Sequence, residues 1–232
     1  MLASAAVSLG VILDMDGLML DTEPISLRVW REAAMDLGYE LSDAICDAMI
    51  GRTSAANCEQ LRTHFGPDFP AEELARTAGV RYRAHLERHG VPHKPGLVDF
   101  LSFLDRRALP RAVATSTATE LARRKLAQAG VLGYLEVVVG GDRVERGKPD
   151  PAIFLAAARA IGVAPAQCVA LEDSGPGVTG AAAAGMRPIL IPDGRLPDAQ
   201  VRASAYAVAE SLTAAKALIE ALIDAPAVPP LA

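Results

Sequence analysis

Residues 7–23, VSLGVILDMDGLMLDTE, constrain the fold of this chain more than any other stretch. The apolar run ends abruptly at Asp14, and Asp16 and Gly17 follow. A short, continuously apolar run that stops at Asp and Gly predicts a buried strand of a parallel sheet. Because functional groups gather at the carboxyl ends of such strands, we expect both carboxylates to face one pocket.

Two carboxylates this close indicate a particular chemistry. Each opposes the ionisation of the other, and a divalent cation relieves that repulsion. With a cation present, Asp14 stays ionised as nucleophile and metal ligand, while Asp16 holds a proton for a leaving group. The alternative is a polar turn that only caps the strand.

Five segments have the pattern of buried strands, and helical patterns separate the last four. Alternating strands and helices predict an α/β fold, a Rossmann-like parallel sheet with helices on both faces. Roughly 95 residues separate the first two strands, whereas a crossover needs about a dozen, so an inserted domain is the simplest account. The predicted strands are residues 7–13, 111–115, 136–139, 168–171 and 187–191.

The inserted segment has helical patterns throughout. Thr22 stands at an N-cap position with Pro24 in the first turn, and Ser42, Ser54 and Pro70 begin three further helices. Two linkers join this segment to the core and can act as a hinge. We predict a helical cap over residues 20–93, a catalytic core over 1–19 and 94–225, and a flexible tail over 226–232.

Polar groups recur where the later core strands end. Parallel strands end at one edge of a sheet, so these groups are expected to lie near the first strand's two carboxylates. Each group alone has an ordinary explanation, such as a helix cap or a solvated loop residue. Their occurrence at successive strand ends favours a common site. The groups are Ser116 and Thr117 after the second strand, Lys148 after the third, and Glu172 and Asp173 after the fourth.

The chemistry of these groups suits phosphoryl transfer. Ser116 and the backbone N–H of Thr117 can donate to a phosphoryl oxygen, and Lys148 supplies a point charge. Asp173, supported by Glu172, completes with Asp14 a set of oxygen ligands that suits Mg²⁺. A nucleophile, charge neutralisation and an acid for the leaving oxygen are the parts that the reaction needs.

Four motifs, LDMDGLMLDTE, ATST, GKPDP and LEDSGPGVTGAAAAGM, occur in this order over residues 9–186. With them the chain resembles the haloacid dehalogenase-like hydrolase superfamily, in the branch with a small helical cap after the first motif. That branch includes β-phosphoglucomutase and phosphatases of sugar phosphates and nucleoside monophosphates. The resemblance implies an aspartyl-phosphate on Asp14, Asp16 as general acid/base, and Ser116 and Lys148 as phosphate binders. It also implies Mg²⁺ held by Asp14, the backbone carbonyl of Asp16 and Asp173, with Glu172 nearby.

Single residues separate the reactions of this superfamily. Dehalogenases lack the acid two residues after the nucleophile, so Asp16 favours phosphoryl chemistry. Phosphonoacetaldehyde hydrolases need a cap lysine, and residues 22–93 contain none. The mutases carry a His where this chain has Ser26, and they too use a cap lysine. We therefore predict a Mg²⁺-dependent phosphatase acting on a small phosphomonoester. A phosphohexomutase is the alternative, and a phospho-accepting signalling module a remote one.

Two cap residues are candidates for substrate recognition. Arg52 ends the second cap helix, where a loop can face the core and meet the substrate's leaving group. Glu23 follows the first linker and can meet a sugar hydroxyl. Their ordinary alternatives are a solvated arginine at a helix end and a surface carboxylate at a helix start.

Bulk composition narrows the partners. The net charge is −5 and no block of Lys and Arg occurs, so neither nucleic acid nor a membrane is expected. Three widely spaced cysteines predict free thiols, and the N-terminal stretch lacks a signal pattern. We expect a cytoplasmic monomer that acts on a small phosphorylated metabolite.

Overall fold

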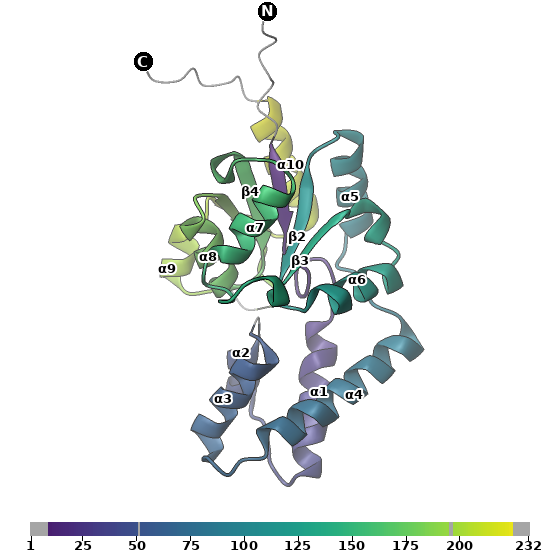
Figure 1. The fold of residues 1–232 in the computed structure, drawn as a ribbon, viewed down its shortest axis with the longest axis vertical. Helices are drawn as coiled ribbons and strands as arrows, with labels where there is room; N and C mark the ends of the chain where they lie inside the picture. The colour runs from purple at the N-terminus through teal and green to yellow at the C-terminus, as the bar shows by residue number, and fades with distance from the viewer. Residues whose placement is uncertain (1–8, 51, 195–196, 225–232) are drawn as a thin grey trace, which may run out of the picture.

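The strand β1 (Gly10–Leu13), which ends at the first carboxylate, lies in the middle of a parallel sheet (Figure 1). This computed structural model describes residues 9–50, 52–194 and 197–224. Over these residues the strand order is β3-β2-β1-β4-β5-β6. The other strands are β2 (Arg111–Thr115), β3 (Val137–Gly140), β4 (Cys168–Glu172), β5 (Arg187–Leu190) and β6 (Ala207–Val208).

The strand order places the end of β1 at a switch point. The chain passes from β1 to its neighbour β2 and on to β3, then returns to β4 on the other side of β1. In open parallel sheets, the crevice at this reversal is where ligands bind. The residues after β1 are therefore in the position that the sheet offers for a site.

Both faces of the sheet are covered by helices, which confirms the predicted fold class. Val11 and Leu13 belong to one hydrophobic cluster and Ile12 to the other, as the alternation of a strand requires. The helices α5 (Leu97–Arg106), α6 (Thr119–Gln128) and α10 (Leu212–Asp224) pack in the first cluster. The helices α7 (Ala152–Ala160) and α8 (Gly175–Ala183) pack in the second, and α9 (Ala199–Ser204) packs on α8. Short 3₁₀ helices lie at Leu132–Tyr134, Gly141–Arg143 and Pro165–Gln167.

The segment between β1 and α5 is helical. Its helices are α1 (Glu23–Asp36), α2 (Asp43–Met49), α3 (Ser54–Phe65) and α4 (Ala71–His89). They enclose a hydrophobic cluster of their own, which includes Trp30, Leu61 and Leu74. Figure 1 shows this group below the sheet, apart from the helices that cover its faces. The boundaries of cap and core at residues 20 and 93 stay a prediction, and the predicted tail, 226–232, lies outside the described residues.

Most predicted helix ends match, with one informative exception. The Ser42 hydroxyl accepts a hydrogen bond from the N–H of Ile45, and Gly90 ends α4 with a positive φ of 78°. Thr22 does precede α1, but its side chain makes no capping bond. Its hydroxyl instead donates to Asp16, so the expected side-chain cap is wrong and the residue serves the site below.

The strand predictions differ from the structure in small ways. The second matches β2, and the others shift by about a residue at one or both ends. Residues 7 and 8 of the first prediction lie outside the described residues. The helix α9 and the strand β6 were not predicted. Because β6 has only two residues and lies at the edge of the sheet, it carries almost no periodic pattern.

The two linkers between cap and core lie side by side. The N–H of Asp21 donates to the carbonyl of Pro92, and that of Lys94 donates to Met19, both at 2.9 Å. The Lys94 ammonium also donates to Asp21 and, at 2.6 Å, to Asp193 of the core. These contacts hold the cap next to the carboxyl ends of the strands.

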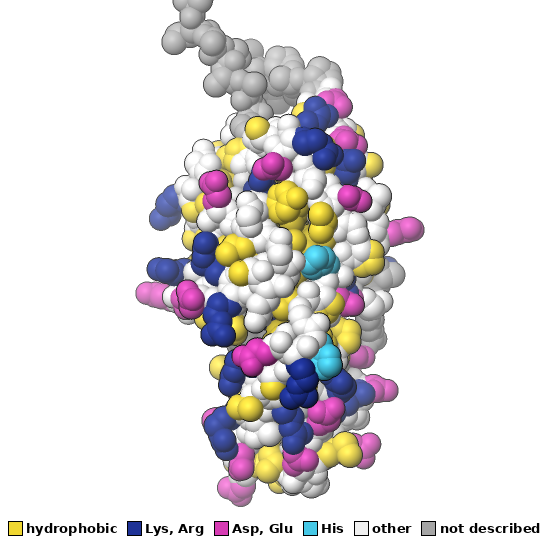
Figure 2. All heavy atoms as spheres, turned by 90° about the vertical axis from the view of Figure 1, so that its right-hand side faces the viewer, with side chains coloured by type: hydrophobic (Ala, Val, Ile, Leu, Met, Phe, Trp, Pro, Cys, Tyr) yellow, Lys and Arg dark blue, Asp and Glu magenta, His cyan; other side chains and the backbone are white. Residues whose placement is uncertain are grey.

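The surface and the thiols add two observations. On the face shown in Figure 2, acidic and basic side chains are interspersed over both the upper core and the lower cap. The three cysteines are buried and free, as predicted. Among residues 9–50, 52–194 and 197–224, no helix is long and apolar enough to cross a membrane.

Candidate active site

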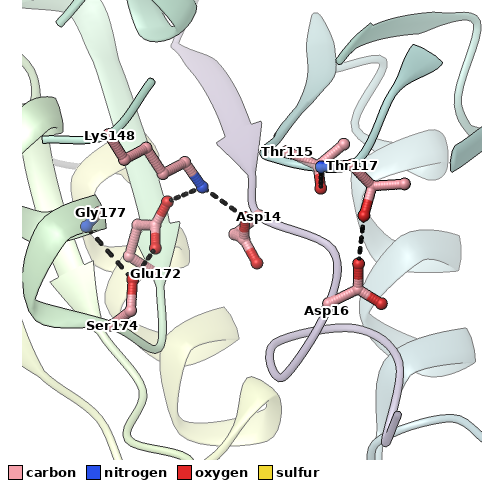
Figure 3. A network of polar contacts seen from close by, with 8 residues as sticks. All are labelled: Asp14, Asp16, Thr115, Thr117, Lys148, Glu172, Ser174 and Gly177. Carbon is pink, nitrogen blue, oxygen red and sulfur yellow. Dashed lines mark hydrogen bonds and ion pairs between the residues drawn. The ribbon is translucent and has the colours of Figure 1, made fainter. Parts of the chain in front are cut away.

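Asp14 is fixed by the sheet itself. Its N–H donates to the carbonyl of Leu171 in β4, so the ladder between β1 and β4 continues to this residue. Its side chain is almost buried and accepts a hydrogen bond from Lys148. Figure 3 shows the Lys148 ammonium between the carboxylates of Asp14 and Glu172. The distance to Glu172 Oε1 is 2.6 Å.

Lys148 stays charged although it is buried. Burial by itself lowers the pKa of an ammonium group, but the carboxylates of Asp14 and Glu172 outweigh burial and raise it. The Phe154 ring, with its centroid 5.4 Å from Nζ, adds a further favourable contact. The lysine predicted to bind phosphate is thus a permanent positive charge beside Asp14.

A third carboxylate completes an acidic cluster. Oxygen atoms of Asp14, Glu172 and Asp173 all lie within 4.8 Å of one another. Burial raises the pKa of Asp173 well above its usual value, and the other two carboxylates add to this. Burial also raises the pKa of Glu172 to about 7 despite Lys148. One lysine does not neutralise three carboxylates, so the cluster can accept another cation.

The geometry around this cluster fits a divalent metal ion. The side chain of Asp173 makes no hydrogen bond or ion pair with another described residue, which leaves its oxygens available. Gly17 has a positive φ of 88°, and a Cβ there would overlap the Asp173 carboxylate. A Cβ on Gly177 would likewise overlap Glu172. The two glycines thus leave room for the carboxylates of Asp173 and Glu172. Together with Asp14, these carboxylates offer the oxygen ligands that a hard cation prefers.

Asp16 has a separate environment, on the other side of the loop from Lys148 (Figure 3). The hydroxyls of Thr22 and Thr117 donate to its two oxygens at 2.7 and 2.8 Å. The Lys125 ammonium donates to Oδ1 at 2.5 Å. Burial acts to raise the pKa of Asp16, but Lys125 and the hydroxyls outweigh burial and lower it. Asp16 is therefore held in one orientation, in its ionised form.

Lys125 is a site residue that the sequence analysis missed. It lies within α6, far from any strand end, and its side chain is 6% exposed. Its ammonium also lies 5.0 Å from the centre of the Tyr82 ring of the cap. A signal was present, because Lys125 shares the buried face of α6 with Ala122 and Leu126. A lysine on a buried face needs a partner.

The loop after β2 uses part of its hydrogen-bonding capacity internally. The N–H of Thr117 donates to the Thr115 hydroxyl at 3.2 Å, and the hydroxyl of Thr117 donates to Asp16. Ser116 lines the cavity beside them. The structure therefore brings Ser116 and Thr117 to the site, while their contact with phosphate stays a prediction.

A cavity of about 350 Å³ lies between core and cap and contains these groups. The predicted cap residues both line it. Burial raises the pKa of Glu23 to about 7, and the nearby Asp16 adds to this. Arg52 is exposed and donates to Gln60 at 2.6 Å. The cap wall also includes Ser26, Trp30, Asn57 and Tyr82, none of which was predicted as a site residue.

A parallel sheet with paired aspartates at its switch point and a helical insert above them defines a class of hydrolase. The chain belongs to the haloacid dehalogenase-like hydrolase family, because the sequence model of that family matches residues 9–185. This confirms the resemblance found in the motifs.

Two relatives that align with most of this chain are phosphatases by name. Fructose-1-phosphate phosphatase YqaB of Escherichia coli is 36% identical over 178 residues, 76% of this chain and 93% of that protein. The phosphorylated carbohydrates phosphatase of Thermotoga maritima is 30% identical over 216 residues, 91% of this chain and 90% of that protein. At the level of enzyme class, the prediction of a phosphoric monoester hydrolase is confirmed.

The fold also occurs in a mutase. The β-phosphoglucomutase of Clostridium difficile superposes with a TM-score of 0.75 over 88% of this chain and 92% of its own. Its sequence identity is 17%, so the likeness concerns the fold alone.

Proposed function

We propose that this chain is a Mg²⁺-dependent phosphatase that hydrolyses a small sugar phosphate through an aspartyl-phosphate on Asp14. The observation that carries the proposal is the place of Asp14, which lines the cavity beside the buried Lys148 and in one cluster with two further carboxylates. The names of the relatives support a phosphorylated carbohydrate as substrate.

In the first step, a carboxylate oxygen of Asp14 attacks the phosphorus and the bond to the leaving oxygen breaks. Lys148 and Ser116 hold the transferring phosphoryl group and offset its charge. Asp14, the backbone carbonyl of Asp16 and Asp173 would hold Mg²⁺, with Glu172 nearby. When bound, the ion neutralises charge on the phosphoryl oxygens.

Asp16 serves both steps as general acid and base. It gives a proton to the leaving oxygen in the first step. In the second it takes a proton from the water that attacks the aspartyl-phosphate, which releases phosphate and restores Asp14. The lowered pKa of Asp16 favours the second role, and the first role needs its protonated carboxyl. Its contacts with Thr22, Thr117 and Lys125 keep it directed at one place.

A phosphohexomutase remains the alternative, supported by the shared fold. A mutase must bind a second phosphate in the cap, and Arg52 is the cationic cap residue that lines the cavity. The cap lacks lysine and has Ser26 instead of the histidine that the mutases carry, so we favour hydrolysis. Monomeric state, cytoplasmic location and the absence of nucleic-acid or membrane partners stay predictions.

Phosphate release from a panel of sugar phosphates and nucleoside monophosphates tests the proposal. Assays run with Mg²⁺ and with EDTA, and Asp14→Asn serves as the blank. We expect release that depends on Mg²⁺ and is greatest with a sugar phosphate. Isomerisation of a hexose 1-phosphate in the presence of a bisphosphate primer, without net release, would instead assign a mutase.

A further inference from the structure

The cap wall of the cavity contains a buried polar atom without a partner. Asn57, the one asparagine of the sequence, lies in the first turn of α3 and is 6% exposed. Its side-chain oxygen Oδ1 is buried and has no hydrogen-bond partner among the described residues. The residue lines the same cavity as Asp14 and Asp16.

Such an atom is unusual in a folded protein. A buried amide oxygen that loses water without gaining a donor destabilises the fold, and most buried polar atoms are paired. The neighbouring Cys58 and Leu61 on α3 pack into the hydrophobic cluster of the cap. An apolar residue of the same size as Asn57 would suit that environment better. The amide therefore has a use outside the fold. Oδ1 is closed off from the cavity in this conformation, and a turn of the amide about its last bond would present it to a donor there.

The surroundings of Asn57 indicate which donor. Hydroxyl groups of Ser26, Thr53 and Ser54 and the ring of Trp30 share the cap wall with it. Arg52, the one cation that the described cap residues bring to this wall, already donates to Gln60. A wall of hydroxyls, an amide and an aromatic ring suits a neutral, hydroxyl-rich group better than a second anionic group.

We propose that Asn57 determines specificity by accepting a hydrogen bond from a hydroxyl of the leaving group, which is a sugar or a sugar alcohol. The inference rests on the proposed phosphatase function. A site built around an amide discriminates strongly against a ligand without the matching hydroxyl, because the amide then stays unpaired. Asn57 contacts the part of the substrate that does not react, so it selects the substrate and leaves the chemical step unchanged.

The test compares wild type with Asn57→Leu on two substrates, a ketohexose phosphate and phenyl phosphate, which has no hydroxyl on its leaving group. Glu59→Leu, an exposed position of the same helix, is the matched control. We expect Asn57→Leu to lower kcat/KM for the ketohexose phosphate by about 10- to 100-fold and for phenyl phosphate by less than about threefold. Its Tm should equal or exceed that of wild type, because the unpaired oxygen is removed.

Four results would overturn the proposal. Equal losses on both substrates, or a lower Tm with unchanged selectivity, would give Asn57 a structural role. Efficient hydrolysis of phenyl phosphate but of no sugar phosphate by wild type would refute this inference and leave the phosphatase intact. Release from neither substrate with Mg²⁺ would refute the phosphatase, and the inference with it.

Discussion

The core and cap walls of the cavity differ in how their polar groups are satisfied. On the core wall, the side chains of Asp14 and Lys148 are buried and bonded to each other, and the partly buried Asp16 accepts hydrogen bonds from Thr117 and Lys125. On the cap wall, Arg52 is exposed and Asn57 has an unpaired oxygen. Buried charges need partners inside the protein, and on the core wall Asp14 and Lys148 have theirs before substrate arrives, while Asp173 is left for a cation. We infer that the core wall performs the reaction, whereas polar groups of the cap wall form their hydrogen bonds with the substrate.

The largest effect is expected at the nucleophile. Asp14→Asn should lower kcat by about 10⁴-fold or more, since an amide does not form the aspartyl-phosphate. The fold should survive, because burial raises the pKa of Asp14 and a neutral side chain suits its position. Phosphate release and circular dichroism check both statements. Substantial turnover in a folded variant would contradict the covalent mechanism.

Removal of the buried cation should damage stability as well as activity. Lys148→Met leaves Asp14 and Glu172 without their shared partner and should cost about 3–5 kcal/mol of unfolding free energy in EDTA. Urea denaturation with and without Mg²⁺ measures this, and Mg²⁺ should recover part of the loss. Lys216→Met, at a more exposed lysine, is the control. Equal stability of the two variants would show that the core wall does not depend on this pairing.

Lys125 should affect the chemical step through Asp16. Lys125→Met removes the ion pair that orients Asp16 and should lower kcat by about 10- to 100-fold with little change in KM. Steady-state kinetics check this split, with the exposed neighbour Arg124→Met as control. A raised KM with unchanged kcat would instead make Lys125 a substrate-binding residue.

The smallest effect concerns Glu23 of the cap wall, whose pKa is raised by burial from 4.5 to about 7. Between these pH values the folded state binds more protons than the unfolded state, so wild-type stability falls as pH rises through this window. Glu23→Gln removes that loss. In EDTA, the free energy of unfolding of Glu23→Gln should exceed that of wild type by near zero at pH 4.5 and by about 1–2 kcal/mol at pH 8. This figure allows for the partial exposure of the side chain. Urea denaturation at several pH values would reject this if the advantage stayed constant.

Local patterns determined the sheet and the groups at its edge. A strand is recognised from consecutive residues, as the match at β2 shows, and parallel strands end at one edge. The places of Asp14, Lys148 and Asp173 therefore follow from their places in the sequence. A two-residue edge strand such as β6 has too few residues for a pattern.

Only the tertiary structure decided the roles of Thr22, Lys125 and Asn57. A threonine before a helix is equally suited to cap it or to bond elsewhere, and packing chose Asp16 as its acceptor. Lys125 and Asn57 lie inside helices, where periodicity identifies the buried face but not what that face meets. That partner depends on how α6 lies against the sheet and how the cap lies over the core, and contacts between residues distant in the sequence decide both.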